Sequence, residues 1–66
     1  MQIQLNGSVA HIKNAQLDIA LEELQFTDFS GMAIAINNSV IPREQWNSTH
    51  IQENDQLVVI TATQGG

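Results

Sequence analysis

The first twelve residues carry the alternating pattern of a β-hairpin. Residues 1–5 read Met-Gln-Ile-Gln-Leu, in which every second side chain is apolar, the period of a strand with one buried face. Asn6 and Gly7 follow, and this pair favours a tight hairpin turn because both of its positions need a positive φ. Residues 8–12, with apolar side chains at three positions, are predicted to form the returning strand.

The next apolar residues recur at the spacing of an α-helix. They occupy positions i, i+3, i+4 and i+7 of one helix face and are Leu17, Ala20, Leu21 and Leu24. We predict a helix over residues 16–25, with Asn14 as its N-cap. Asp18 lies in the first turn, where a negative charge suits the helix dipole. Glu22 and Glu23 are expected to form the solvated face.

The second half of the chain consists of short apolar runs separated by turn residues. It predicts, in order, strands at 32–36 and 40–41 around a turn at 37–39, one helical turn at 43–46, a turn at 54–55 and a last strand from 57 to 63. Pro42 ends the second of these strands, because proline lacks a backbone donor. Trp46 is expected to lie over the core.

This order, β-β-α-β-β-β, predicts an α+β fold of the β-grasp (ubiquitin-like) type. Such a fold has a mixed sheet of about five strands with one main helix, and its last strand lies centrally beside the first. The sheet and the helix form two layers around one core. We expect the β-grasp domain to span residues 1–62 and a flexible C-terminal tail, residues 63–66, to end in Gly-Gly.

Length and composition narrow the possible functions. A chain of 66 residues buries only about 60% of the surface that its unfolded form exposes. A pocket for a drug-sized ligand needs roughly 300 Å³, which would take much of such a core and argues against an enzyme acting alone. The chain has no cysteine, which excludes disulfides, thiolate nucleophiles and cysteine metal sites.

The charge of the chain excludes further classes of partner. Lys13 and Arg43 stand against seven acidic residues, giving a formal net charge of −5. A nucleic-acid binder needs clustered basic side chains, and an anionic membrane surface repels an acidic chain. No apolar run approaches the roughly 18 residues of a membrane span. We therefore expect a soluble, cytoplasmic protein that binds neither nucleic acid nor membrane.

Three segments resemble one protein family. Residues 35–46, Ala-Ile-Asn-Asn-Ser-Val-Ile-Pro-Arg-Glu-Gln-Trp, resemble the Pro-Arg-x-x-Trp stretch of the thiamine-pathway sulfur carriers, the ThiS family. Residues 51–57 resemble that family's entry into the last strand, with Asn54 where the family usually has glycine, a conservative change if the backbone there is left-handed. Gly65 and Gly66 match the family's Gly-Gly end. With the hairpin and helix, the resemblance covers essentially the whole sequence.

The resemblance implies a carrier without a cofactor rather than an enzyme. A ThiF-like adenylyltransferase would use ATP to convert the Gly66 carboxylate into an acyl-adenylate. Sulfur from a donor protein would then give a thiocarboxylate, which a ThiG-like thiazole synthase would receive. Gly66 would be the reacting residue, and Gly65 would contact the partner, because a backbone without Cβ enters a narrow channel. Residues 63–66, if extended, would reach about 13 Å at roughly 3.3 Å per residue.

The body of the domain is expected to carry the docking surface for these partners. If the buried positions of the last strand face the helix, then Val58, Ile60 and Ala62 lie on the open face of the sheet. We expect these three residues and Arg43 to bind a partner, with pairing of Arg43 to an acidic side chain as an equal alternative. Acidic side chains around the surface would orient a basic partner.

Other interpretations of the sequence remain open. His11 and His50 have no third ligand at ligand spacing, so no metal site is expected. A molybdopterin-type sulfur carrier and a ubiquitin-like protein modifier share the fold and the Gly-Gly end. A passive β-grasp interaction domain is the remaining alternative. It predicts full function when a residue is added after Gly66, whereas the carrier and the modifier predict loss.

Overall fold

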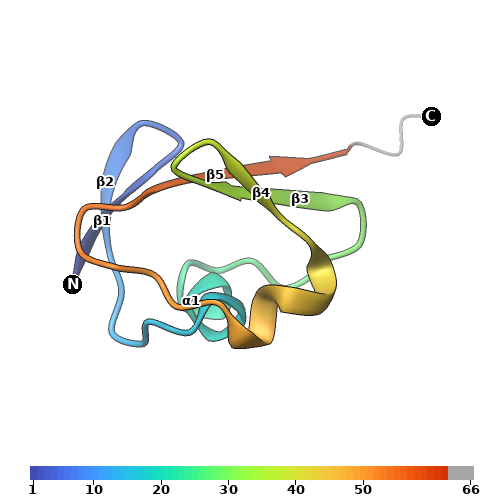
Figure 1. Cartoon of the computed structure of the whole chain (residues 1–66), viewed down its shortest axis with the longest axis horizontal. Coiled ribbons are helices and arrows are strands. Elements are labelled where there is room, and N and C mark those ends of the chain that lie inside the picture. The colour runs from blue at the N-terminus through green and yellow to red at the C-terminus, as the bar shows by residue number, and fades with distance from the viewer. Residues whose placement is uncertain (63–66) are drawn as a thin grey trace.

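The computed structural model describes residues 1–62, and Figure 1 shows its strands and helices. The elements are β1 (Gln2–Leu5), β2 (Ser8–His11), α1 (Leu17–Glu23), β3 (Met32–Ile36), β4 (Ser39–Ile41), the 3₁₀ helix η1 (Arg43–Ser48) and β5 (Gln56–Thr61). The predicted order is confirmed. The helical turn predicted at 43–46 extends to Ser48. The last strand, predicted to run to residue 63, ends at Thr61; Ala62 follows it, and residue 63 lies outside the described residues.

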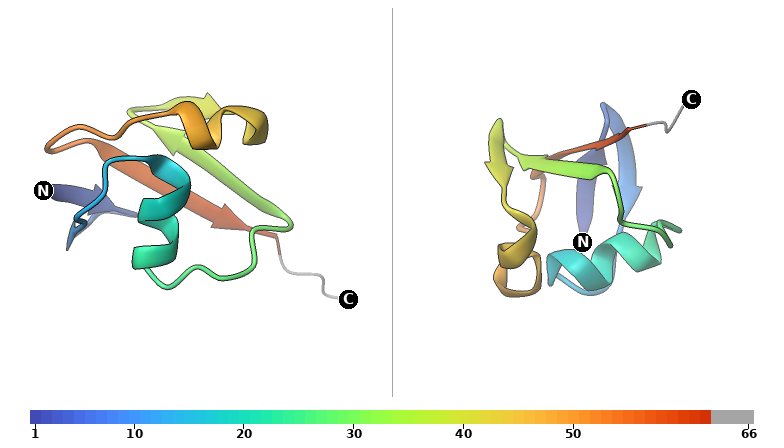
Figure 2. Two further views of the ribbon diagram at one scale, coloured as in Figure 1. Left: turned by 90° about the horizontal axis from the view of Figure 1, so that it is seen from below. Right: turned by 90° about the vertical axis from the view of Figure 1, so that its right-hand side faces the viewer.

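The strands form one mixed sheet with the order β2-β1-β5-β3-β4. β1 runs parallel to β5, and the other neighbouring pairs are antiparallel. The last strand is therefore central and lies beside the first, as predicted. α1 and η1 lie on one side of the sheet, and the opposite face is left open (Figure 2). The α+β fold with a five-stranded sheet and one α-helix is confirmed.

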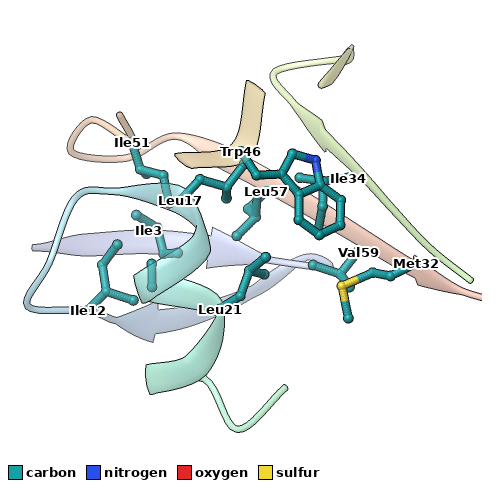
Figure 3. Close-up of a cluster of buried hydrophobic side chains, with 11 residues drawn as sticks. Ile3, Ile12, Leu17, Leu21, Met32, Ile34, Trp46, Ile51, Leu57 and Val59 are labelled. Carbon is teal, nitrogen blue, oxygen red and sulfur yellow. The ribbon is translucent and has the colours of Figure 1, made fainter. Parts of the chain in front are cut away.

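The core lies between the sheet and the helices (Figure 3). Its buried side chains come from every layer and are Ile3, Ile12, Leu17, Ala20, Leu21, Met32, Ile34, Trp46, Ile51, Leu57 and Val59. Trp46 is 4% exposed, and its Nε1–H donates to the carbonyl of Ile41 at 2.9 Å. The prediction that this indole belongs to the core is confirmed, and the hydrogen bond satisfies its polar atom.

Asparagine and glycine provide the left-handed backbone of the turns. Asn6 and Gly7 have φ of 50° and 86°, as the predicted hairpin turn requires. Asn37 and Asn38 have φ of 51° and 71°, so the β3–β4 turn is two residues long and Ser39 already belongs to β4. Asn54 has φ of 69°, so the backbone is left-handed, the condition under which asparagine in place of the glycine implied by the resemblance is a conservative change.

The beginning of α1 differs from the prediction. Asn14 is not the N-cap: the helix begins after Gln16, and the Asn14 side chain accepts a hydrogen bond from the Gln16 N–H at 2.9 Å. The cause is a contact distant in sequence, because Leu17 N–H donates to Thr49 O and Ile51 N–H donates to Ala15 O. Residues 15–17 are therefore paired with 49–51, and the helix starts at Leu17, one residue later than predicted.

The end of α1 is set by one left-handed residue. Gln25 has φ of 76°, Phe26 N–H donates to Leu21 O at 3.0 Å, and Gln25 N–H donates to Glu22 O at 3.0 Å. These two bonds form the Schellman arrangement, which satisfies helix carbonyls that lack an intrahelical partner. Phe26 at the same time reaches back toward Leu21 and packs at the core. The predicted helix is therefore two residues too long at its end.

Glu23 has a structural role that its place on the exposed helix face does not reveal. Its carboxylate accepts the backbone N–H groups of Lys13 and Asn14 at 2.7 and 2.8 Å. These hydrogen bonds favour the charged form and lower the pKa of Glu23 below the usual glutamate value. The carboxylate thus ties the connection after β2 to the end of α1, which corrects the expectation of a purely solvated role.

Candidate functional site

β5 has one buried and one exposed face. Leu57 and Val59 are buried beneath the helix, whereas Val58 and Ile60 are exposed on the opposite side of the sheet. Ala62, which follows the strand, is also exposed. The predicted division of the last strand is confirmed. Because β5 is the central strand, its exposed side chains lie in the middle of the open sheet face.

The strand register joins these residues to apolar side chains that sequence reasoning missed. Ala35 of β3 lies opposite Val58 on one side and Val40 of β4 on the other. Ala33 lies opposite Ile60. We call this surface the open face and define it by Val9, Ala33, Ala35, Val40, Val58 and Ile60. The alternation of side chains within the short strands could have predicted that Val9 and Val40 are exposed on this face; Val40 is 74% exposed.

The open face carries no formal charge. The five strands contain no Asp, Glu, Lys or Arg, and their polar neighbours on this face include Gln4, which pairs with both Val9 and Gln56. The acidic residues lie instead in α1, η1 and the connections, and are Asp18, Glu22, Glu23, Asp28, Glu44, Glu53 and Asp55. The negative charge expected around a docking surface is thus confined to its rim and to the helix layer.

Arg43 is engaged within the fold. Its guanidinium carbon lies 4.8 Å from the Trp46 ring centroid, and its Nη2 donates to the carbonyl of Phe29. Phe29 meets Trp46 edge to face at a centroid distance of 5.7 Å. Together with residues of α1 and η1 they line a shallow surface hollow of about 280 Å³. This packing places Arg43 away from the open face, at the edge of the helix layer.

The loop held by Arg43 contacts the end of the last strand. Gly31 O accepts the N–H of Ala62 at 2.8 Å, and a Cβ on Gly31 would stand 3.6 Å from the Ala62 Cβ. Gly31 also has φ of 72°, a conformation that favours glycine. In the same loop, Asp28 accepts hydrogen bonds from the Ser30 hydroxyl and N–H, which lowers the pKa of Asp28. The loop therefore holds Ala62 in line with β5.

The described residues bring only part of the predicted site together. Val58, Ile60 and Ala62 lie along one strand, and Arg43 is separate from them. Gly65 and Gly66, the predicted contact and reacting residues, lie outside the described residues. Within residues 1–62, no three His, Asp or Glu side chains gather where a metal ion would bind, and no helix has the length and apolar character to cross a membrane.

Comparison with known proteins identifies the family. Residues 3–66 match the ThiS family. The sulfur carrier protein ThiS of Escherichia coli (strain K12) is 33% identical over 66 residues, covering all of both chains. A crystal structure of a thiamine biosynthesis protein (ThiS) from Geobacter metallireducens superposes with a TM-score of 0.81 at 20% identity over the full length of both chains. An NMR structure of a thiamine biosynthesis protein from the same organism gives 0.77, covering 88% of that chain. The two structures support the fold, and the family match over nearly the whole sequence shows that this chain belongs to the ThiS family.

Proposed function

We propose that this protein carries sulfur for the synthesis of the thiamine thiazole and bears it as a thiocarboxylate on Gly66. The observation that carries this proposal is the family match across residues 3–66, which includes Gly65 and Gly66. The relative named as a sulfur carrier is covered over its whole length as well. The absence of cysteine leaves no thiol side chain to carry the sulfur, so a carrier of this sequence needs another acceptor.

The chemistry proceeds in two substitutions. An oxygen of the Gly66 carboxylate attacks the α-phosphorus of ATP, the new P–O bond forms, and pyrophosphate leaves. Hydrosulfide released by the sulfur donor then attacks the acyl carbon and a C–S bond forms. The acyl C–O bond breaks, AMP leaves with that oxygen, and loss of the S–H proton leaves the thiocarboxylate. A partner adenylyltransferase performs the first step, since a free carboxylate is a poor electrophile. Thiazole synthase receives the sulfur from the thiocarboxylate.

The body of the domain supports such a role by offering a neutral apolar docking surface. We propose that Val58, Ile60 and Ala62 contact the adenylyltransferase, with Gly65 inside its active site. Exposed apolar residues gathered on one sheet face are typical of protein interaction surfaces. Arg43 contributes through the loop that holds Ala62, and its direct contact with a partner stays a prediction.

The proposal is tested by mass spectrometry of the intact chain. The purified protein is incubated with the adenylyltransferase, ATP and a sulfur donor, and the product is expected to gain the mass difference between sulfur and oxygen at Gly66. A matched variant with one alanine added after Gly66 should gain nothing, because it displaces the reacting carboxylate. Failure of the unextended chain to react, with an adenylyltransferase proven active on another carrier, would contradict the proposal.

A second readout separates the carrier from the alternatives. A ubiquitin-like modifier would give higher-mass species that contain this chain and survive denaturation. A molybdopterin-type carrier would pass its sulfur to a molybdopterin precursor rather than support thiazole formation. The proposal therefore expects thiazole formation with purified thiazole synthase, and no lysine-linked conjugates.

A further inference from the structure

The outer half of β5 has a neighbouring strand on only one side within residues 1–62. The parallel pairing with β1 ends at Leu5 opposite Leu57, whereas the antiparallel pairing with β3 continues to Met32 opposite Thr61. Figure 1 and the left view of Figure 2 show β5 and β3 running together past the tip of the β1–β2 hairpin. The sheet is thus narrower at the end of β5 from which residues 63–66 continue.

The side chain of Asn6 ends the pairing on the β1 side. Its main-chain N–H donates to Leu57 O at 2.9 Å. Its carboxamide then accepts the N–H of Val59 at 2.9 Å and donates to the carbonyl of Val59 at 3.2 Å. A carboxamide offers the same donor and acceptor as a peptide group, so it replaces one further residue of β1. It reaches no farther, because Gly7 turns the chain back into β2.

The peptide groups of Thr61 face the side that β1 does not reach. Ala62 N–H donates to Gly31 O, so Ala62 is directed toward the β3 side. In an antiparallel ladder, residues that bond the neighbour alternate with residues whose N–H and C=O point the other way. Thr61 is therefore directed toward the β1 side, where no strand residue of 1–62 lies opposite it. Its side chain is exposed as well, so nothing in this part of the chain buries the edge.

We propose that this edge, the N–H and C=O of Thr61 beside the Asn6 turn, binds an extended segment of the adenylyltransferase as an added strand. The proposal rests on the proposed function and specifies how the same partner binds the chain. Strand addition recognises main chain rather than side chain. It suits this part of the chain because Gly66 lies only five positions after Thr61, and the last two of those positions are glycines.

The choice of this partner follows from continuity and from the order of the reactions. The edge adjoins Ile60, a central residue of the open face that we assign to the same enzyme. The adenylyltransferase also acts on the unmodified chain, before any group on Gly66 exists to be recognised. On the other side of the sheet, β4 reaches only as far as Ile34, and the N–H of Met32 beyond it already donates to Phe29 O at 3.2 Å, which restricts strand addition there.

A proline substitution tests the edge, because proline removes the donor and is tolerated on a free strand edge. Thr61→Pro is compared with Thr61→Val, which keeps the N–H and the branched side chain. We expect both variants to retain the thermal unfolding midpoint, since the Thr61 N–H bonds no residue of β3. In ATP–pyrophosphate exchange, Thr61→Pro should raise the KM for the carrier about tenfold, as expected for one lost hydrogen bond at an interface, and Thr61→Val should change it little.

Hydrogen exchange of the unsubstituted protein provides an independent test that needs no chemistry. The Thr61 amide should exchange rapidly in the free chain and slowly in the complex with the adenylyltransferase in the absence of ATP. Equal exchange of Thr61 in both states, or equal KM values for the two variants, would overturn the strand addition even where adenylation is normal. Protection in the free chain that grows with its concentration would assign the edge to a second copy and also overturn it. Loss of adenylation in the unsubstituted chain would instead contradict the proposed function.

Discussion

Single residues with a left-handed backbone decide where the elements of this small domain end. Asn6, Asn37 and Asn54 occupy such positions in turns, a backbone conformation that asparagine adopts more readily than most other residues. The side chains of Asn6 and Asn37 bond distant residues within β5 or directly before it, not their own turns. Gln25 occupies one at the end of α1, where glycine is usual. Glutamine is not among the residues that favour this conformation, so Gln25 retains strain, which the Schellman hydrogen bonds and the packing of the partly buried Phe26 offset.

Gln25→Gly is therefore expected to stabilise the protein. Glycine adopts the left-handed conformation without strain, and this gain exceeds the cost of its added freedom in the unfolded chain. The free energy of unfolding should therefore rise by about 0.5–1 kcal/mol. Urea unfolding followed by circular dichroism measures the change. Glu22→Gly, inside the same helix, serves as the control and should destabilise by about 1 kcal/mol. Equal destabilisation by both variants would show that Gln25 carries no strain.

Glu23 gives the stability a dependence on acidity. Its pKa is lower in the folded than in the unfolded chain, because two backbone N–H groups donate to its carboxylate. The stabilisation is fully present above the unfolded glutamate pKa and is lost as the pH falls through the lower folded value. Glu23→Gln should lower the free energy of unfolding at neutral pH and reduce the fall of that free energy in acid.

Urea unfolding at several pH values between neutrality and strong acid checks the effect of Glu23. Glu22→Gln removes the same charge from the exposed neighbouring residue and should leave the fall of stability in acid unchanged. If both variants gave the same profile, the hydrogen bonds to Lys13 and Asn14 would not be the source of the dependence.

At the scale of elements, contacts between η1, the loop before β3 and the end of β5 form one continuous support. Arg43 of η1 stacks on Trp46 and binds the Phe29 carbonyl, and Gly31 in the same loop binds Ala62. The Phe29 carbonyl also accepts the Met32 N–H at 3.2 Å, which closes the loop. The loop thus connects η1 to Ala62, the last residue that the structure describes.

Arg43→Ala is expected to loosen the end of β5 without unfolding the domain. Loss of the bond to Phe29 and of the stacking on Trp46 should cost about 1–2 kcal/mol. Amide exchange of Ala62 should become faster, because its acceptor Gly31 is no longer held. Lys13→Ala removes the same charge elsewhere and should leave the exchange of Ala62 unchanged. An unaltered Ala62 amide in Arg43→Ala would show that the loop is held by its own turns.

At the scale of the whole molecule, charge and apolar surface are separated between the two layers. The acidic residues lie in the helices and connections, and the open face combines valine, isoleucine, alanine and glutamine. A partner that meets the open face loses little charge hydration, so its affinity depends on shape and apolar area more than on salt. We expect the acidic residues around the open face to affect the rate of encounter instead.

Ile60→Lys tests the open face. Ile60 is 61% exposed, so the substitution should change the free energy of unfolding by less than about 0.5 kcal/mol. It should raise the KM of the carrier for the adenylyltransferase about tenfold or more, because a charge enters an apolar interface. Gln45→Lys adds the same charge on η1 and should have little effect. Equal KM values for the two variants would place the docking surface elsewhere.

The sequence by itself determined the elements and their order. Alternation, helical spacing and the Asn-Gly turn are properties of neighbouring residues, so they predicted the hairpin, the helix face and the division of β5 into buried Val59 and exposed Val58. The segment from Ala35 to Trp46 also indicated the family. The comparisons then confirmed that resemblance, whereas the roles of Gly65 and Gly66 stay proposals.

Only the tertiary structure decided what depends on register and on contacts distant in sequence. The start of α1 moved because residues 15–17 pair with 49–51, and Arg43 faces Phe29 because the loop before β3 packs on η1. The order of the strands places Val9 and Val40 on the same open face as the exposed residues of β5. The point at which β1 stops leaves the edge at Thr61 free beyond the Asn6 side chain. The physical reason is that periodicity records which face a residue occupies, while its neighbours on that face come from other parts of the chain.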